Sequence, residues 1–230
     1  MTGTTISLGN LSVAIGMPVG KPIPPQTVSS IFATAYRMGQ MGIRCDLLMQ
    51  VCGVVTIARD SVLDEFLACG ADKLFWIDSD MAWTPSDFIR MLALSTKYDV
   101  VAVAYPSRSL DGVFQVNTDG LATHAISEHG LFNVNSLGLG FCIVDRKPLE
   151  LLASRAPRVI DGYSQKEMAE VFRVDRTATG HRRTEDVAFF GDLREAGFTV
   201  WCDPSIELGH IGEKEWRGRL SDAVRLNSAA

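Results

Sequence analysis

Residues 73–85 have the sequence KLFWIDSDMAWTP, in which an apolar run stops abruptly at two carboxylates one residue apart. The run KLFWI has the length and composition of a buried β-strand, and Thr84 followed by Pro85 is typical of a helix start. Asp78 and Asp80 therefore come directly after a strand. In an open α/β sheet, ligands bind in the crevice beyond the carboxyl ends of the strands. The stretch predicts a site where carboxylate oxygens bind a divalent cation and a phosphorylated ligand.

A purely structural explanation exists for the same residues. Asp and Ser are common turn formers, Thr84 suits a helix N-cap, and Asp87 is favourable near the positive end of a helix. An Asp-x-Asp triplet by itself is a weak signal for metal binding. Its position after an apolar strand is what favours the metal hypothesis over the structural one.

Length and composition predict one globular domain over residues 1–230, with a loose lead-in at 1–10 and a C-terminal tail at 213–230. The chain has 230 residues, of which 47% are hydrophobic, so a sizeable core is expected. Its formal net charge of −5 argues against a general nucleic-acid or anionic-membrane binder, since those need a basic face.

The five cysteines are an odd number, widely scattered and without a Cys-x-x-Cys pair, which favours free thiols in a reducing compartment. The N-terminus lacks a basic segment, and the apolar run 11–17 is too short and Gly-interrupted for a signal sequence. No stretch approaches the roughly 20 apolar residues that span a bilayer. We therefore expect a cytoplasmic protein without a membrane span.

Strand and helix patterns alternate along the first half of the chain. A strand at 11–15, ended by Gly16, precedes a helix at 26–38 and a strand at 44–51. A capping box at Ser61 indicates a helix that Gly70 ends, and the strand 73–77 follows. This alternation predicts an α/β fold with a mainly parallel central sheet flanked by helices.

The second half is more varied. A β-branched strand at 98–105 precedes short antiparallel pieces within 111–135, and the turn Gly138-Leu-Gly140 leads into a strand ending at Val144 with no helix directly after it. The two glycines indicate either close backbone packing or room for an acceptor against the backbone.

Residues 155–183 are polar and locally basic. They predict a solvated, mobile loop, or alternatively a surface for an anionic acceptor or a sugar diphosphate. Thr184 then suits the N-cap of a helix with Glu185 and Asp186 in its first turn, where the helix dipole alone would favour acidic residues. A strand at 198–202 follows, and His210 comes late in the chain.

Taken in order, these pieces resemble the GT-A glycosyltransferases, particularly those of family 2. The resemblance covers residues 11–212 and rests on the order of the motifs more than on any one of them. The motifs are Ala58-Arg59-Asp60, Asp78-Ser79-Asp80, Gly138-Leu-Gly140, Thr184-Glu185-Asp186 and His210.

The resemblance implies a GT-A-like nucleotide-diphospho-sugar transferase fold and metal-dependent transfer of a sugar from a nucleotide-diphosphate sugar to an acceptor hydroxyl, with inversion. It implies that Asp78 and Asp80 hold Mn²⁺ or Mg²⁺, with His210 completing the shell. Asp186, with Glu185 beside it, corresponds to the general base that removes the acceptor proton.

The resemblance also implies a UDP-sugar as the favoured donor, although the family pattern usually has Asn where this chain has Asp60. The acceptor stays open among a glycan, a small molecule, a protein and a modified nucleic-acid base. The chain lacks the Gln-x-x-Arg-Trp motif of processive synthases. The expected nucleotide-sugar-binding residues are Met17, Pro18, Arg59, Asp78, Ser79 and Gly140.

Three alternatives remain beside the transferase hypothesis. A non-catalytic GT-A-like domain could bind nucleotide or protein without turnover. A sugar-nucleotide pyrophosphorylase shares the core, but its N-terminal Gly-rich basic loop is absent. A phosphohydrolase of the haloacid dehalogenase type also uses an Asp-x-Asp at a strand end, but it normally has Thr or Val where this chain has Ala82.

Overall fold

The computed structural model describes residues 11–108, 112–119, 125–162 and 164–223. The expected lead-in at 1–10 and the end of the expected tail, 224–230, lie outside these residues. The helices are α1 (Pro25–Gln40), α2 (Val55–Cys69), α3 (Pro85–Leu94), α4 (Arg146–Arg155), α5 (Glu185–Glu195) and α6 (Leu220–Ala223). The strands are β1 (Ser12–Val19), β2 (Arg44–Val51), β3 (Lys73–Ile77), β4 (Met81–Ala82), β5 (Val100–Ala102), β6 (Val116–Asn117), β7 (Phe132–Val134), β8 (Ser136–Leu137), β9 (Phe141–Asp145), β10 (Arg158–Ile160), β11 (Glu167–Ala169), β12 (Asp175–Arg176), β13 (Arg182–Arg183), β14 (Val200–Cys202), β15 (Leu208–Ile211) and β16 (Glu215–Gly218).

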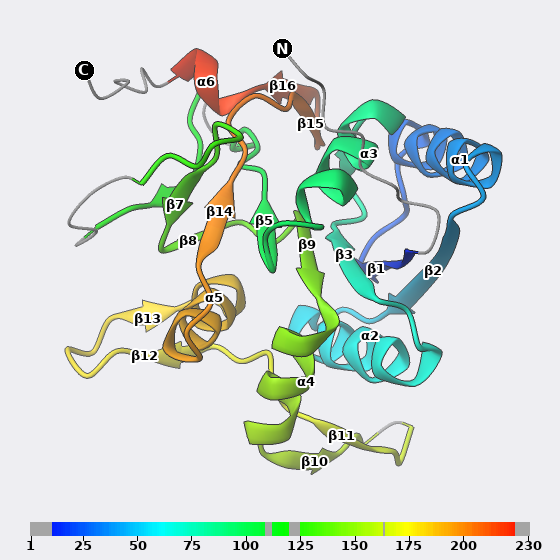
Figure 1. Ribbon diagram of the computed structural model, residues 1–230. Helices are drawn as coiled ribbons and strands as arrows, with labels where there is room; N and C mark the ends of the chain where they lie inside the picture. The colour runs from blue at the N-terminus through cyan, green and yellow to red at the C-terminus, as the bar shows by residue number, and fades with distance from the viewer. Residues whose placement is uncertain (1–10, 109–111, 120–124, 163, 224–230) are drawn as a thin grey trace.

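A seven-stranded sheet forms the centre of the molecule, with the strand order β2-β1-β3-β9-β5-β14-β7 (Figure 1). Strands β2, β1, β3, β5 and β14 run in one direction, and β9 and β7 run against them. The prediction of an α/β fold with a mainly parallel sheet is confirmed. Because five strands share a direction, their carboxyl ends meet at one edge, where the start of the antiparallel β9 also lies.

Helices cover both faces of this sheet (Figure 1). Along β3, Phe75 packs with its ring 4.6 Å from that of Phe88 in α3, within a core that also includes Met38 of α1. Trp76 faces the opposite layer, which α2, α4 and α5 supply. A strand buried on both faces needs apolar residues at every position, which explains why the run before Asp78 is continuous rather than alternating.

Two predicted element boundaries in the first half are wrong. Gly16 lies inside β1, which continues to Val19, and a Cβ there would come within 2.7 Å of the Val62 side chain. The helix expected to open at Ser61 begins at Val55 instead. The Ser61 hydroxyl donates to the Ile57 carbonyl one turn earlier in the same helix, so Ser61 is not the N-cap. The Gly70 end is confirmed, since Gly70 has a left-handed φ of 73°.

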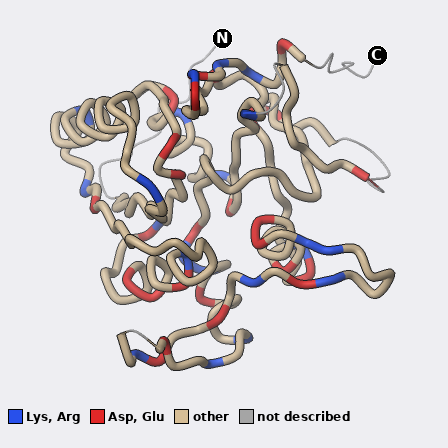
Figure 2. The backbone as a smooth tube through the Cα atoms, turned by 180° about the vertical axis from the view of Figure 1, so that it is seen from behind, with Lys and Arg blue, Asp and Glu red and all other residues tan. Residues whose placement is uncertain are grey.

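The second half differs from expectation in three segments. Helix α4 follows β9 directly, where no helix was predicted, and its apolar positions Leu149 and Leu152 pack into the core. The expected tail contributes β16, which pairs with β15. The basic segment 155–183 forms the hairpins β10–β11 and β12–β13 (Figure 1), on which both charge signs occur (Figure 2).

Charge pairing gives the second hairpin its local order. Arg183 donates two hydrogen bonds to Asp175 at 2.7 and 2.6 Å, and Arg173 makes a two-point contact with Asp192 of α5. The five cysteines are free thiols, with Cys142 and Cys202 buried. Within the described part of the chain, no helix is both long and apolar enough to cross a membrane.

Candidate active site

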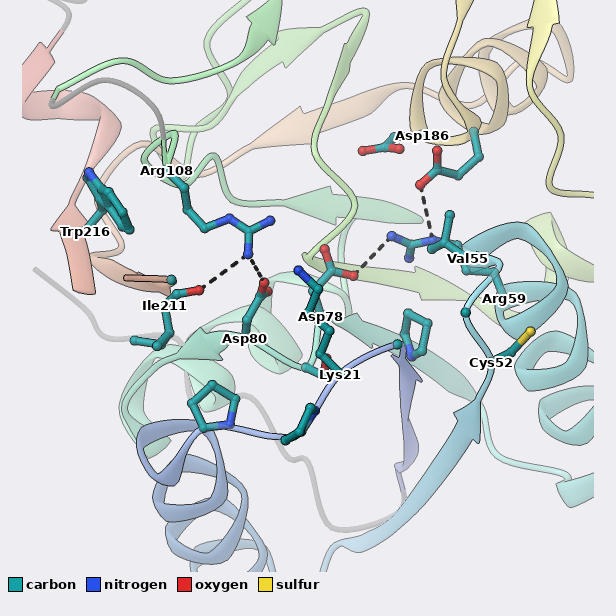
Figure 3. Close-up of a pocket in the computed structure, with 18 of the residues that line it drawn as sticks. Lys21, Cys52, Val55, Arg59, Asp78, Asp80, Arg108, Asp186, Ile211 and Trp216 are labelled. Carbon is teal, nitrogen blue, oxygen red and sulfur yellow. Dashed lines mark hydrogen bonds and ion pairs between the residues drawn. The ribbon is translucent and has the colours of Figure 1, made fainter. Parts of the chain in front are cut away.

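A cavity of about 1040 Å³ opens at the sheet edge where the parallel strands end (Figure 3). Residues that follow β1, β2, β3 and β5 reach it, together with the start of α5 and the segment after β15. Among the described residues that line it, five are acidic and three are basic, so the cavity has an excess of negative charge. The acidic residues are Asp78, Asp80, Glu185, Asp186 and Glu213, and the basic ones are Lys21, Arg59 and Arg108.

The turn after β3 places Asp78 and Asp80 in this cavity. Thr84 forms a capping box with Asp87, so the helix start predicted at this position is confirmed. The Trp83 backbone N–H donates to the buried Ser30 hydroxyl at 3.0 Å, and its indole N–H donates to Thr34 at 2.9 Å. Helix α1 therefore holds the far end of the turn, and both carboxylates stay partly accessible, each 26% exposed.

His210 reaches Asp80 through strand pairing. Strand β15 pairs antiparallel with β4, which sets His210 opposite Met81, and the Ile211 N–H donates to the Asp80 carbonyl at 2.8 Å. The His210 Nδ1 lies 2.8 Å from the Pro106 carbonyl, which can only accept, so Nδ1 carries the proton. Its Nε2 faces Asp80 Oδ1 at 3.7 Å. In the neutral ring this nitrogen is a free ligand atom.

Asp80 also has a cationic partner that the sequence analysis missed. Arg108 donates to Asp80 Oδ2 at 2.5 Å and lies 3.5 Å from the Ile211 carbonyl (Figure 3). Arg108 follows β5 at the same sheet edge, which is the sequence signal that could have identified it. Trp216 of β16 was missed too, because only the pairing of β16 with β15 brings it to the cavity.

Arg59 lies beneath the carboxylates and is 2% exposed. It donates to Asp78 Oδ1 at 3.1 Å, and its Nε is 3.9 Å from Glu185 Oε1. Burial lowers the pKa of Arg59, but Asp78, Asp186 and Glu185 together raise it above its usual value. Among the described residues, its Nε and Nη1 have no hydrogen-bond partner. The guanidinium therefore joins the turn after β3 to the start of α5 and keeps two buried nitrogens without a hydrogen-bond partner.

Burial raises the pKa of two carboxyl groups around Arg59. For Asp78, Arg59 and His210 oppose the rise, and Asp80 and Asp186 add to it. For Glu185, burial, the charge of Asp186 and a hydrogen bond between the two carboxyl groups raise the pKa to about 7. Glu185 is therefore partly protonated near neutral pH.

The Gly138–Gly140 turn is packed closely against the site. The Leu139 N–H donates to Asp186 Oδ2 at 3.4 Å, and the Gly140 N–H donates to the Tyr105 hydroxyl at 3.3 Å. A Cβ on Gly140 would lie 2.7 Å from Asp78 Oδ2, and one on Gly138 would collide with the Tyr105 ring. Both glycines are therefore closely packed on the side where a Cβ would lie, and Gly138 also lines a smaller cavity next to Asp186.

The structure brings most of the predicted site residues to this cavity, with three exceptions, of which His210 lies beside Asp80 but lines a smaller neighbouring cavity. Pro18, Arg59, Asp78, Ser79, Asp80, Glu185 and Asp186 line the cavity. Met17 instead points into the core and is fully buried, since successive β1 side chains alternate between faces. Gly140 lies behind Asp78 and shapes the wall from there. Thr184 occupies the predicted N-cap of α5, but its side chain makes no capping hydrogen bond.

The residues fit a divalent cation that a substrate helps to bind. Within the described residues, no group of three or more His, Cys, Asp or Glu side chains is placed to hold a metal alone. Asp80 lines the cavity, and the Nε2 of His210 lies 3.7 Å from Asp80 Oδ1, so the two side chains offer two neighbouring ligand atoms. Mg²⁺ typically takes one or two carboxylates and completes its shell with water and substrate phosphates.

Asp60 supports the site from below. Its Oδ1 accepts the N–H groups of Val171 at 2.9 Å and Phe172 at 3.0 Å. This places the Phe172 ring 5.2 Å from Trp76 and 5.9 Å from the Arg59 guanidinium carbon. Burial raises the pKa of Asp60 to about 7, although the two backbone hydrogen bonds oppose the rise. An Asn side chain has an oxygen that could accept the same two bonds.

We expect Asp60→Ala to lower the free energy of unfolding by about 1–3 kcal/mol, because it leaves two buried N–H groups without an acceptor. Asp60→Asn should retain wild-type stability, since the amide oxygen replaces Oδ1. Urea denaturation of the two variants at pH 7.5 tests this. Equal losses in both would show that the carboxylate charge, and not the acceptor, holds residues 171–172.

The free energy of unfolding should fall as the pH rises from 5 to 8. Asp60 and Glu185 keep their protons up to about pH 7 in the fold, whereas the unfolded chain releases them near 3.8 and 4.5. The native state therefore binds more protons across this window, and Asp60 alone should account for a fall on the order of 2 kcal/mol. Denaturation at each pH measures it, and Asp60→Asn should flatten the profile. A rise in stability over this window would contradict the assignment.

Comparison with known proteins identifies the fold. No family model and no curated protein sequence matches the chain. The crystal structure of A197 from STIV superposes with a TM-score of 0.54 at 21% identity, covering 88% of this chain and 86% of that one. GalNAc-T7, crystallised with UDP, GalNAc and Mn²⁺, superposes with a TM-score of 0.52 at 9% identity, covering 88% of this chain and 43% of that one. The chain thus has a GT-A-like fold, and it spans less than half of the GalNAc-T7 chain.

Proposed function

We propose that the protein is a metal-dependent glycosyltransferase that moves a sugar from a nucleotide-diphosphate sugar, with a UDP-sugar favoured, to an acceptor hydroxyl with inversion. The observation that carries this proposal is the arrangement at the sheet edge, where Asp80 lies 3.7 Å from His210 Nε2 and lines the same cavity as Asp186. The GT-A-like fold and the UDP and Mn²⁺ in the GalNAc-T7 crystal agree with it.

In this proposal Asp80 and His210 hold Mn²⁺ or Mg²⁺, with Asp78 beside them. When bound, the cation would neutralise charge on the departing diphosphate. Arg108 must then release Asp80 Oδ2, and its guanidinium becomes available to the diphosphate. Pro18, Cys52 and Gly53, at the ends of β1 and β2, line the part of the cavity that would take the nucleoside.

Asp186 acts as the general base in this proposal. It accepts the proton of the acceptor hydroxyl as the oxygen attacks the sugar carbon and the bond to the diphosphate breaks. The hydrogen bond from Glu185 and the N–H of Leu139 hold the Asp186 carboxyl in place. Arg59, enclosed by Asp78, Asp186 and Glu185, keeps these acidic groups close together.

Thermal unfolding with a panel of nucleoside diphosphates and nucleotide sugars tests the binding half of this proposal. With Mn²⁺ and ligand at about 100 times its Kd, the native state should gain about 2.7 kcal/mol, which for a chain of this size raises Tm by roughly 5–10 °C. UDP ligands should give the largest shift. The proposal fails if no member of the panel raises Tm, or if chelator leaves the shifts unchanged. Protection without any turnover would favour the non-catalytic alternative.

A further inference from the structure

We infer that a smaller cavity beside the candidate active site binds the acceptor, and that it takes one neutral, hydroxylated ring of monosaccharide size. This inference rests on the proposed glycosyl transfer. The cavity has a volume of about 390 Å³ and meets the larger one at Arg108 and Asp186, which line both. A group bound in it lies next to the candidate base, while the larger cavity is left for the donor.

The hydrogen-bonding groups of the smaller cavity suit hydroxyl groups. The Tyr105 hydroxyl accepts the Gly140 N–H, which leaves its own proton to donate. The Gln115 side chain forms no hydrogen bond with any residue that the structure describes, so it offers both a donor and an acceptor. Asp186 supplies a further acceptor.

The charges around this cavity favour a neutral ligand over an anion. Arg108 is the cationic side chain in its wall, but its guanidinium pairs with Asp80 in this structure and contacts the donor diphosphate in the proposed complex. His210 donates its Nδ1 proton to the Pro106 carbonyl and turns Nε2 toward Asp80. An acidic acceptor would therefore meet Asp186 without a free cation to compensate it. A hydroxyl group meets no such repulsion and provides the proton that Asp186 accepts.

The walls of the smaller cavity limit what can enter. Gly138 packs directly against the Tyr105 ring, so a ligand cannot push these two residues apart or lie between them. On the other side, a bridge between Pro106 and Phe114 and a hydrogen bond from the Ser107 N–H to the Val113 carbonyl hold the segment that carries Gln115. Ligand cavities usually measure about 300–1,000 Å³, so this one is at the low end. That volume suits a single ring.

Saturation-transfer NMR with a panel of methyl glycosides tests this inference on the full-length chain, with and without UDP and Mg²⁺. Gln115→Trp should fill the cavity from its exposed rim, and Gln115→Leu should remove the amide at nearly constant size. Gln40→Trp, at the exposed end of α1, is the matched control. We expect at least one glycoside to bind at millimolar concentration, with affinity reduced at least tenfold by Gln115→Trp, several-fold by Gln115→Leu, and unchanged by Gln40→Trp.

The outcomes separate this inference from the proposed function. UDP affinity in Mg²⁺ should be equal in wild type and Gln115→Trp, because Gln115 does not line the larger cavity. The inference is overturned if no methyl glycoside binds the wild type, if binding survives Gln115→Trp, or if UDP displaces the glycoside. If neither the wild type nor any variant binds UDP while the glycoside still binds, the donor assignment is contradicted and the glycoside site stands.

Discussion

Asp186→Asn should lower the rate of sugar transfer by about 10²- to 10⁴-fold, the usual cost of losing a general base. Nucleotide-sugar binding should survive, because Asp186 lies across the cavity from Asp80 and His210. Glu185→Gln should cost much less, since Gln has the shape of the protonated carboxyl and still donates to Asp186. Single-turnover rates at saturating donor, with donor affinity measured separately, give the comparison.

A structural role for Asp186 predicts a different pattern. Removing an acidic residue from the first turn of α5 would lower stability by about 0.3–1 kcal/mol and leave transfer nearly intact. Product stereochemistry is an independent check, because direct displacement gives the anomer opposite to that of the donor. An NMR spectrum with the donor anomer retained would refute Asp186 as the base of an inverting reaction, even if the variant were inactive.

Asp80→Asn should weaken metal-dependent binding of nucleoside diphosphate by about 100-fold or more. Replacing a group that only orients a metal ligand already lowers metal affinity or activity by about 10- to 100-fold. The change also removes the charge that pairs with Arg108 at 2.5 Å. Titration calorimetry with UDP in Mn²⁺ measures the affinity. Asp64→Asn, in the middle of α2 and outside the cavity, is the control.

Two results of this titration would count against the metal assignment. One is wild-type affinity in Asp80→Asn with Mn²⁺ present. The other is equal affinity of the wild type in Mn²⁺ and in chelator, because Arg108 would then be sufficient to bind the diphosphate. Circular dichroism of the variant should match that of the wild type, since the Asp80 side chain is 26% exposed.

Local sequence patterns predicted an element correctly where short-range interactions determine it. The run before Asp78 predicted β3, because a strand buried on both faces must be apolar throughout, and Thr84 with Asp87 predicted the start of α3 through a capping box. The order of strands and helices then indicated the α/β fold. The same local logic failed at Ser61, whose hydroxyl bonds to the preceding turn of a helix that was already under way.

The remaining site residues depend on contacts that no local pattern encodes. His210 reaches Asp80 because β15 pairs with β4, and Trp216 reaches the cavity because β16 pairs with β15. The position of Arg108 after β5 could have placed it at the sheet edge, but its ion pair with Asp80 could not be read from the sequence. Met17 was assigned to the site from a resemblance, but side chains alternate between the two faces of β1, and Met17 points into the core.

The most direct test of the central claim is a turnover measurement with UDP-sugar donors and Mn²⁺, in which released UDP is quantified and the anomer of the sugar product is identified by NMR. We predict UDP release that requires the divalent cation, falls by at least 100-fold in Asp186→Asn, and yields the anomer opposite to that of the donor. The claim would be contradicted if chelator and Asp186→Asn both left UDP release at the rate of the wild type in Mn²⁺. It would also be contradicted if no donor gave any release.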